Sequence, residues 1–495
     1  MKKVILFVID SLHPVVLGKI LSEGKAPALR FLAKHGTYFD RVISSFPTMT
    51  PVATSSMITG TWPNRHRVPG FIWYNEEIRK IVDYGATWQS ILKLGTEKVL
   101  RNLLIKLNEE HLNPKTLTLY ERLEASGYTT GNINFMMHRG THPYQAKLPL
   151  LLALATRFHL SQADVSGPSH LTLGQLIHPP FSGGSNSYPR GAFHRFGFND
   201  TFSGTIAAQI VREGKQPDLM VVYFPDNDKY SHQHGPLRSG PSIEHADAQV
   251  AAVLNEYGSW EKAVEENVFI VTGDHAQSTV GLGNEYLIDL DHALRSFKRL
   301  KATEEACENN NYEIAICPNE RMAYIYILQR TKEILADVVD ALCEDVRHAQ
   351  IAWKVSENGY CVLQGGTEKQ LLFSQIGPYQ DVYGQSWSCE GDLSVVDAQV
   401  TGEQTIEFGK FPDALTRLIS ALEARGGSRV VVSAASGYEY LAVGGPIHPG
   451  GGSHGSLEEE DSTVPMIVAG MPVNLEHPRI IDLVPMILEH FHCTQ

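Results

Sequence analysis

The sequence predicts an α/β fold: a doubly wound, mostly parallel sheet flanked by helices. Short apolar runs look like central strands that are buried on both faces, and helical patterns lie between them. Acidic residues closely follow three of these runs. Alternation of strand and helix is typical of this architecture, and such sheets bind ligands at the carboxyl ends of their strands. We therefore expect a functional site at one edge of the sheet.

The expected strands are short runs, most of them rich in β-branched residues: Val4–Ile9, Leu219–Phe224, Val268–Thr272, Val430–Ser433 and Met466–Ala469. Two of the helical patterns between them are Thr118–Ala125 and His245–Tyr257. The acidic residues that follow the first three strands are Asp10, then Asp226 and Asp228, then Asp274. The chain thus brings carboxylates to one edge from three separate segments.

The pattern changes in the second half of the chain, where a smaller α+β insertion is expected over residues 301–424. It should contain a strand, a helix and a strand pair: Met322–Leu328, Thr331–Asp345, and Ile351–Val355 with Tyr360–Leu363. Residues 1–300 and 425–495 would form the catalytic core. Within that core, residues 90–200 contain an irregular region with the Gly/Ser/Pro-rich stretch Ser182–Pro189.

The net charge and the cysteine content argue against a nucleic-acid-binding protein and against a disulfide-stabilised one. The chain has 495 residues, 43% of them hydrophobic, and a formal net charge of −13. That charge argues against a partner that is a nucleic-acid polymer, but it allows a small phosphorylated substrate because metal ions can reverse the local sign of a site. Six scattered cysteines without a CxxC pair favour reduced thiols.

No segment looks like a signal peptide or a membrane span. The apolar run after Met1 is six residues long and ends at Asp10 without a small-residue cleavage site. The apolar stretch Leu148–Ala155 is far shorter than the roughly 20 residues that a span requires. A cytoplasmic location is therefore expected.

Three segments offer metal-ligand chemistry. Asp228 and His232 lie four residues apart just beyond a strand, so they can converge on one cation, with His234 as a nearby alternative. Asp274 and His275 follow a strand that ends in Gly273. Each pattern alone is also compatible with an ordinary solvated loop or turn.

The third segment is the glycine-rich stretch around His454, in which glycines let the backbone approach closely and leave the imidazole unobstructed. A flexible loop with an incidental histidine is the alternative. His448 lies six residues earlier, and the flanking glycines favour His454 as the ligand.

Thr50 is the candidate nucleophile. Thr50 followed by Pro51 is typical of a helix N-cap with proline at the first helical position. Such a helix start presents free N–H groups and a positive dipole end, which suit a phosphate group. A threonine that only caps a helix is the alternative, since a free hydroxyl is a poor nucleophile and needs activation, for example by zinc.

Together these segments resemble the alkaline phosphatase superfamily, and within it the type I phosphodiesterase/nucleotide pyrophosphatase-like branch. The matching order is a strand ending in aspartate, FPTxT ending in TG, DxxxHxxGP, GDH and GGSHG. In this chain the motifs are Asp10, Phe46–Gly60, Asp228–Pro236, Gly273–His275 and Gly451–Gly455. Each motif is weak alone, but five in the correct order are specific, and they span residues 10 to 455.

The resemblance implies an alkaline phosphatase-like fold and two divalent ions, zinc in the first place, with manganese or another ion as alternatives. One ion would be held by Asp228, His232 and His454. The other would be held by Asp10, Asp274, His275 and the Thr50 oxygen. The implied reaction is hydrolysis of phosphodiester or pyrophosphate bonds in nucleotide-like substrates through a phosphothreonine intermediate on Thr50.

The chain departs from the branch pattern at two positions. Phe71 stands where a phosphate-binding asparagine is expected, with Asn75 as the nearest substitute, and Ala53 stands where the branch tends to have asparagine. Another donor or the backbone N–H groups after Thr50 would then bind the phosphate. A phosphomonoesterase or phosphonate hydrolase on the same ions is therefore a close alternative. A binding protein on an inactive scaffold is the alternative of another class.

Overall fold

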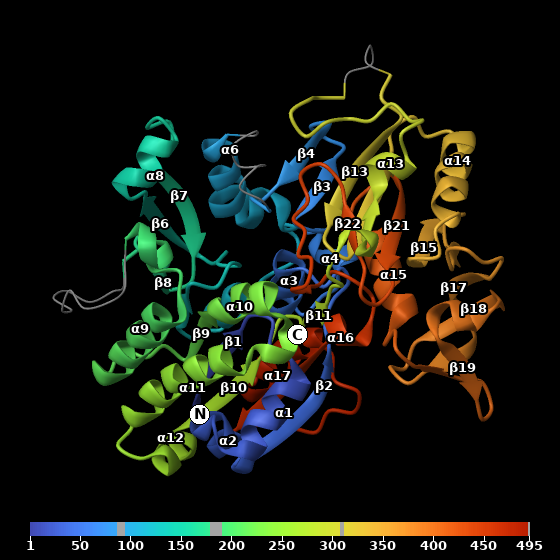
Figure 1. The fold of residues 1–495 in the computed structure, drawn as a ribbon. Coiled ribbons are helices and arrows are strands. Elements are labelled where there is room, and N and C mark those ends of the chain that lie inside the picture. Colours follow the sequence, from blue (N-terminus) through green and yellow to red (C-terminus); the bar gives the residue numbers. More distant parts are fainter. Residues whose placement is uncertain (87–94, 179–190, 307–310, 494–495) are drawn as a thin grey trace.

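A mixed sheet forms the centre of the molecule, which a computed structural model describes for residues 1–86, 95–178, 191–306 and 311–493 (Figure 1). The Gly/Ser/Pro-rich stretch 182–189 and Cys307 lie outside these ranges. In the described part the sheet has seven strands in the order β2-β24-β10-β1-β9-β5-β8. Their bounds are Gly36–Ile43, Thr463–Ala469, Asn267–Thr272, Lys3–Ile9, Leu219–Phe224, Thr130–Ile133 and His170–Thr172.

The predicted α/β class and the flanking helices are confirmed. Strands β10, β1, β9, β5 and β8 are mutually parallel. Helices cover both faces because alternate side chains of each strand point to opposite sides. One face packs against α1, α2, α9, α11 and α12, and the other against α3, α7 and α17. The bounds of these helices are Pro14–Glu23, Pro27–Lys34, Asp200–Arg212, Gly240–Asn255, Trp260–Glu266, Thr50–Thr59, Leu119–Ala125 and Leu483–His490.

Two strand predictions are wrong in their placement. The run Met466–Ala469 lies in β24, which pairs antiparallel with both β10 and β2. The run Val430–Ser433 lies in β21 (Ser428–Ala434), which belongs to a different sheet. Both runs are apolar because they are buried on both faces. Continuous burial, rather than parallel pairing, produces such a pattern, so the pattern does not reveal the direction or the partner of a strand.

The second sheet contains the predicted elements of the insertion. The expected strands and helix occur as β14, the antiparallel pair β15 and β16, and α14, with Thr331 as the helix N-cap. In the described residues this sheet has nine strands, and its path runs β13-β14-β21-β15-β16-β17-β20-β19 with β18 beside β17. The strands along this path have the bounds Ile314–Asn319, Met322–Ile327, Ser428–Ala434, His348–Lys354, Tyr360–Leu363, Gln370–Asp381, Thr405–Phe408 and Ala398–Thr401. Strand β18 is Ser386–Gly391, and the helices that accompany the sheet are α14 (Lys332–Cys343) and α15 (Ala414–Leu422).

The boundary of the insertion at residue 424 stays a prediction. Since β21 pairs with both β14 and β15, the second sheet extends beyond that boundary. Residues 90–200, where an irregular region was expected, supply β5 and β8 to the central sheet. They also supply a hairpin of β6 and β7 with helix α8 at its tip (His142–Lys147, Gln162–Gly167 and Leu150–Ala155).

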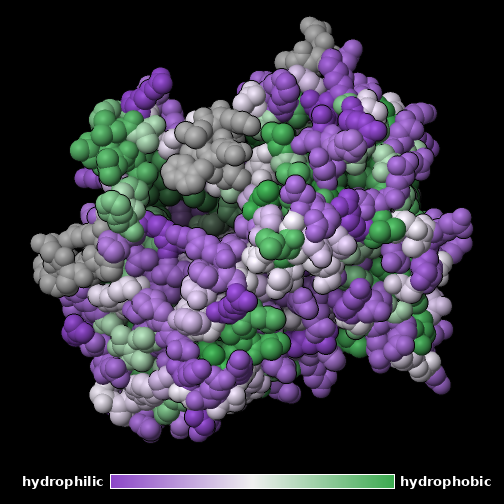
Figure 2. All heavy atoms as spheres, viewed as in Figure 1, coloured by the Kyte–Doolittle hydropathy of each residue, from purple (hydrophilic) through white to green (hydrophobic). Residues whose placement is uncertain are grey.

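The surface on the side shown in Figure 2 is hollowed above α10 (Asp226–His234), between the segment that carries α8 and the second sheet. In the described part of the chain, no helix is long and apolar enough to cross a membrane. The cysteines in the described part of the chain, Cys317, Cys343, Cys361, Cys389 and Cys493, are free thiols.

Candidate metal centre

The candidate site lies where the parallel strands of the central sheet end. Asp10 directly follows β1, and Asp228 lies in the first turn of α10, which begins two residues after β9. Asp274 and His275 follow β10 after one glycine. Because β1 pairs in parallel with both β9 and β10, their carboxyl ends are neighbours. The predicted convergence of acidic residues from three segments is therefore present.

His454 reaches the same edge for a different reason. Its glycine-rich loop precedes β24, whose direction is opposite to that of β10. The amino end of β24 consequently lies beside the carboxyl ends of its parallel neighbours. Gly455, at φ +111°, has the carbonyl oxygen of Asn319 only 2.4 Å from the position a Cβ would take. Glycine is thus required there for the loop to pack against the turn after β13.

Thr50 faces the site from the start of α3. Met49, not Thr50, is the N-cap, and its carbonyl accepts hydrogen bonds from the N–H groups of Val52 and Ala53 at 2.9 Å each. The predicted capping role of Thr50 is therefore wrong by one position. The Thr50 Oγ1 instead lies 3.2 Å from Nε2 of His275. The hydroxyl is free for chemistry because it does not cap the helix.

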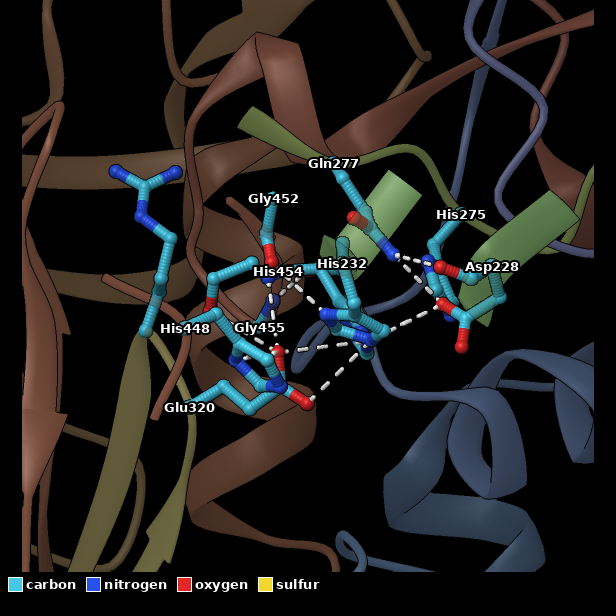
Figure 3. Close-up of polar contacts among 12 residues, drawn as sticks. Asp228, His232, His275, Gln277, Glu320, His448, Gly452, His454 and Gly455 are labelled. Atoms are coloured by element: carbon cyan, nitrogen blue, oxygen red, sulfur yellow. Dashed lines mark hydrogen bonds and ion pairs between the residues drawn. The ribbon is translucent and has the colours of Figure 1, made fainter. Parts of the chain in front are cut away.

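Three imidazoles present the same ring nitrogen to the site (Figure 3). The Nδ1 atoms of His232, His275 and His454 lie 2.8, 3.1 and 2.6 Å from the backbone carbonyl oxygens of Gly452, Ala276 and Thr48. A backbone carbonyl oxygen can only accept a hydrogen bond, so each Nδ1 is the donor and each Nε2 is the ring nitrogen left to face the site. Such carbonyl contacts are how metal-binding histidines are oriented.

Asp10 and Asp274 each use only one of their two carboxylate oxygens for hydrogen bonds. Asp10 accepts a short hydrogen bond from Tyr223 at Oδ2, and Asp274 accepts from the N–H groups of Ser11 and His275 at Oδ1, at 3.1 and 3.0 Å. The other oxygens, Asp10 Oδ1 and Asp274 Oδ2, are buried and have no hydrogen-bond partner among the residues that the structure describes. Buried carboxylate oxygens are costly unless paired or bound to a metal, so these atoms fit a cation.

The donor atoms lie at separations that suit one ion. His275 Nε2 is 3.7 Å from Asp10 Oδ1, 3.5 Å from Asp274 Oδ2 and 3.2 Å from Thr50 Oγ1. A tetrahedral zinc ion with bonds of about 2.0–2.1 Å separates its ligands by about 3.3–3.4 Å. These four groups could therefore hold one cation.

A second set of donors adjoins the first. Asp228 Oδ1 is 3.2 Å from Nε2 of His232 and 3.8 Å from Nε2 of His454. The rings of His454 and His275 are stacked with centroids 3.9 Å apart, so the two sets are neighbours. All seven residues predicted from the sequence are thus brought together at one edge of the sheet.

Charge crowding shifts the titration of these groups in the metal-free protein. Burial, followed by Asp274 and Asp228, raises the pKa of Asp10 well above its ordinary value. Burial lowers the pKa of His454 to about 4. For His232, burial lowers the pKa, but Asp228 and Glu320 outweigh it and raise the pKa to about 10. Carboxylates that repel one another in a buried site are stabilised by a divalent cation.

Several neighbours of the site were not predicted. Tyr223, the penultimate residue of β9, holds Asp10, and Gln277 donates from Nε2 to Asp228 Oδ1 at 2.7 Å. Glu320, on the turn between β13 and β14, faces His232 and His454. Tyr223 precedes Asp226 by three residues and could have been suspected. Glu320 could not, because only tertiary contacts bring its sheet to the site.

The two alternative histidines have different positions. His234 is exposed, and its Nδ1 lies 3.0 Å from the carbonyl of Tyr230 in its own helix. His448 stacks on His232 with centroids 4.1 Å apart and lines the pocket. His454, as predicted, is the one that lies among the Asp228 and His275 donors.

A pocket of about 530 Å³ opens over the site. Phe71 lines it, whereas Ala53 is buried in the core on α3. Asn75 is not a substitute donor, because its Oδ1 accepts from the N–H of Glu77 at 3.0 Å, outside the pocket. Pro51 has no N–H group, and the next two N–H groups are bonded to Met49. Among the lining residues, Lys229 supplies a positively charged side chain.

The fold and the family comparison define this protein as a metal-dependent hydrolase of the alkaline phosphatase superfamily. The sequence model of the type I phosphodiesterase/nucleotide pyrophosphatase family matches residues 4–369, and the chain belongs to that family. No curated protein sequence matches the chain.

Solved structures of mammalian relatives share the fold. Murine ectonucleotide pyrophosphatase/phosphodiesterase 5 superposes with a TM-score of 0.57, and the human protein with 0.56. Each is 14% identical in sequence, and the match covers 100% of this chain and 96% of the other. A third structure, with a TM-score of 0.57, is the murine protein described as an inactive threonine-to-alanine variant in complex with AMP, again 14% identical and with the same coverage.

Proposed function

We propose that this protein hydrolyses phosphodiester or pyrophosphate bonds of nucleotide-like substrates with two divalent ions and Thr50 as the nucleophile. The observation that carries the proposal is the position of the Thr50 hydroxyl, 3.2 Å from His275 Nε2 and beside two adjoining sets of metal donors. A threonine that served only the helix would direct its oxygen to the backbone.

The ions are assigned to the two donor sets. Asp228, His232 and His454 would hold the first ion, and Asp10, Asp274, His275 and Thr50 the second. Mixed imidazole and carboxylate donors at these separations suit zinc, and manganese is the alternative because it also accepts carboxylate and imidazole ligands. When bound, the ions would lower the pKa of the Thr50 hydroxyl and neutralise charge on the phosphate.

The residues of this chain then perform a two-step displacement. The Thr50 hydroxyl releases its proton to solvent water, which can pass one on to the leaving oxygen, and the Thr50 oxygen attacks phosphorus, so that a new P–O bond forms while the bond to the leaving oxygen breaks. The leaving oxygen takes up a proton. Water next attacks the phosphothreonine, which releases the phosphate product and restores the hydroxyl. Tyr223 and Gln277 keep Asp10 and Asp228 in place during both steps.

The substrate is proposed to carry a nucleoside. A murine relative of this fold binds AMP, and the pocket above Thr50 has an apolar side at Met49, Phe71 and Met136 that suits a flat base. Lys229, which lines the same pocket, would meet the phosphate charge in place of the missing asparagine. A phosphomonoesterase or phosphonate hydrolase remains the second candidate, favoured by Phe71 at that position. The cytoplasmic location stays a prediction.

One set of assays tests this function. We expect the purified protein to contain two equivalents of divalent metal and to cleave bis-p-nitrophenyl phosphate faster than p-nitrophenyl phosphate. Thr50→Ala should lower kcat by at least about 1000-fold, because removal of a nucleophile leaves only the remaining transition-state stabilisation. Thr50→Ser, which keeps a hydroxyl, is the matched control. It should retain measurable turnover, and the intermediate phosphorylated at residue 50 should be detectable in it.

Each part of the proposal has its own contrary result. A preference for the monoester would replace the phosphodiesterase assignment with the phosphomonoesterase one. Undiminished turnover by Thr50→Ala at full metal content would show that Thr50 is not the nucleophile. An inactive wild-type protein without bound metal would favour a binding protein on an inactive scaffold.

A further inference from the structure

Glu320 is a buried carboxylate that the ligand assignment above does not use. It lies on the two-residue turn between β13 and β14, in the second sheet, and is 5% exposed. Its Oε2 accepts hydrogen bonds from Ser453 Oγ at 3.0 Å and from the N–H of His454 at 3.1 Å. Both donors belong to the glycine-rich loop, so the carboxylate is fixed relative to the His454 ring.

The same carboxylate faces the ring nitrogens of His232 and His454, two of the residues assigned to the first ion (Figure 3). Glu320 Oε1 lies 3.9 Å from Nε2 of His232, and Oε2 lies 3.5 Å from Nε2 of His454. These Nε2 atoms are the ring nitrogens left to face the site, because the Nδ1 atoms contact backbone carbonyls.

We propose that Glu320 is a fourth protein ligand of the first metal ion, beside Asp228, His232 and His454. This inference rests on the proposed two-metal function. The separations between the two imidazole Nε2 atoms and the two carboxylates are 3.2 and 3.8 Å to Asp228 and 3.9 and 3.5 Å to Glu320, which bracket the about 3.3–3.4 Å expected for ligands of one zinc ion. With these four residues holding it, the first ion would still be able to bind a substrate oxygen. Two carboxylates on one ion also favour manganese more than an Asp-His-His set does.

A separate third ion held by His232, Glu320 and His448 is the competing arrangement, since these residues also lie within reach of one another. His232 has one free nitrogen, and that atom is nearer to Asp228 (3.2 Å) than to Glu320 (3.9 Å). The Nδ1 of His448 lies 3.3 Å from Oε2 of Glu439 and 3.9 Å from Glu320. His232 cannot serve two ions, so the geometry favours a single ion with Glu320 as ligand.

The backbone supports a functional role for this side chain. Glu320 has φ +60°, in the left-handed region that glycine adopts most easily. A non-glycine residue held there is typical of functional sites, where the gain from the side chain offsets the strain. Glycine would suit the turn better, but it would remove the carboxylate.

The test measures metal binding directly. Metal-free wild type, Glu320→Gln and His448→Gln are titrated with Co²⁺ and Zn²⁺ by calorimetry, and the visible spectrum of bound Co²⁺ is recorded. Glutamine keeps an oxygen that accepts the bonds from Ser453 and His454. We expect Glu320→Gln to lower the affinity for one of the two ions by at least about 100-fold and to change the Co²⁺ spectrum. Loss of a residue that only hydrogen-bonds to a metal ligand lowers metal affinity by about 10–100-fold, so loss of a ligand should exceed that range. His448→Gln should leave both constants unchanged.

The outcomes separate this inference from the proposed function. If wild type binds two ions and Glu320→Gln binds both with wild-type affinity and spectrum, Glu320 is not a ligand, whereas the two-metal function stands. If wild type binds fewer than two ions, the proposed function itself fails. A third wild-type ion that both variants lose would establish the competing arrangement. The melting temperature of each metal-free variant shows whether it is folded.

Discussion

His66 illustrates how a buried histidine can serve structure alone. It is fully buried as the last residue of the short helix α4 (Pro63–His66), with Nε2 3.1 Å from Ser56 Oγ and Nδ1 accepting from the N–H of Val68 at 3.2 Å. Burial lowers its pKa to about 3. The imidazole is therefore neutral in the folded protein over the whole range in which a free histidine titrates.

This shift predicts a loss of stability in acid. The folded pKa of His66 is below its ordinary value, so neutral His66 contributes its full stability above about pH 6.5, and the contribution is lost as the pH falls from about 6.5 towards 3. His66→Gln should reduce the slope of unfolding free energy against pH by up to about 1.4 kcal/mol per unit in this range. Urea unfolding of the metal-free protein between pH 4 and 7 measures it. The exposed His292 provides the control His292→Gln, and equal slopes for both variants would contradict the prediction.

At the level of elements, a buried arginine ties the β13–β14 turn to the loop of His454. Arg321 donates from Nη1 to Asp461 Oδ1 at 2.8 Å and from Nη2 to Glu458 Oε2 at 2.7 Å, and its N–H donates to the His454 carbonyl at 2.9 Å. The other oxygen of Asp461 accepts from the N–H and Oγ of Ser456 at 3.0 and 2.6 Å. The loop is thereby held against the second sheet.

Removal of this arginine should destabilise the fold strongly. Arg321→Met leaves two buried carboxylates without their cation, and breaking a buried pair costs about 3–5 kcal/mol. Arg212→Met is the matched control, since Arg212 pairs with Glu256 at the surface with its side chain 66% exposed, where such a pair contributes about 0–1 kcal/mol. Unfolding free energies of the metal-free proteins test the difference. Similar losses in the two variants would show that Arg321 does not anchor the loop.

At the scale of the molecule, the proposed ligands join segments that are far apart in the chain. They come from the ends of β1, β9 and β10, from the start of α3 and from the loop before β24. Ions bound only by the folded protein therefore stabilise the whole central sheet, by about 4 kcal/mol per ion at a free concentration 1000 times the Kd.

Metal removal should consequently lower the melting temperature. With dialysis against a chelator we expect a decrease on the order of 5–10 °C by calorimetry, because two sites lose their stabilisation. Addition of Zn²⁺ should restore the original value. Asp10→Asn weakens one site and should show a smaller decrease on chelation than wild type. Equal melting temperatures with and without metal would contradict a two-metal centre.

The local parts of the fold and the site were predictable because their signals are local. Buried strands such as β1 and β10 show as apolar runs, the helix α7 begins with a capping box at Thr118, and each proposed ligand lies on a short motif next to a strand or a glycine. The order of those motifs indicated the superfamily. The position of Thr50 at the start of a helix was predicted from the proline that follows it, although the N-cap is Met49, one residue earlier.

Pairing and proximity were decided only by the tertiary structure. The antiparallel direction of β24, which brings His454 to the ends of the parallel strands, leaves no mark in an apolar run. The position of β21 in the second sheet is equally hidden. Glu320 stands in a short polar turn that resembles any hairpin, and its contact with His232 and His454 depends on how two sheets pack. The sequence by itself determined which residues can bind metal at the end of each strand. Long-range packing decided which other carboxylate joins them, because residues distant in the chain become neighbours only when the layers assemble.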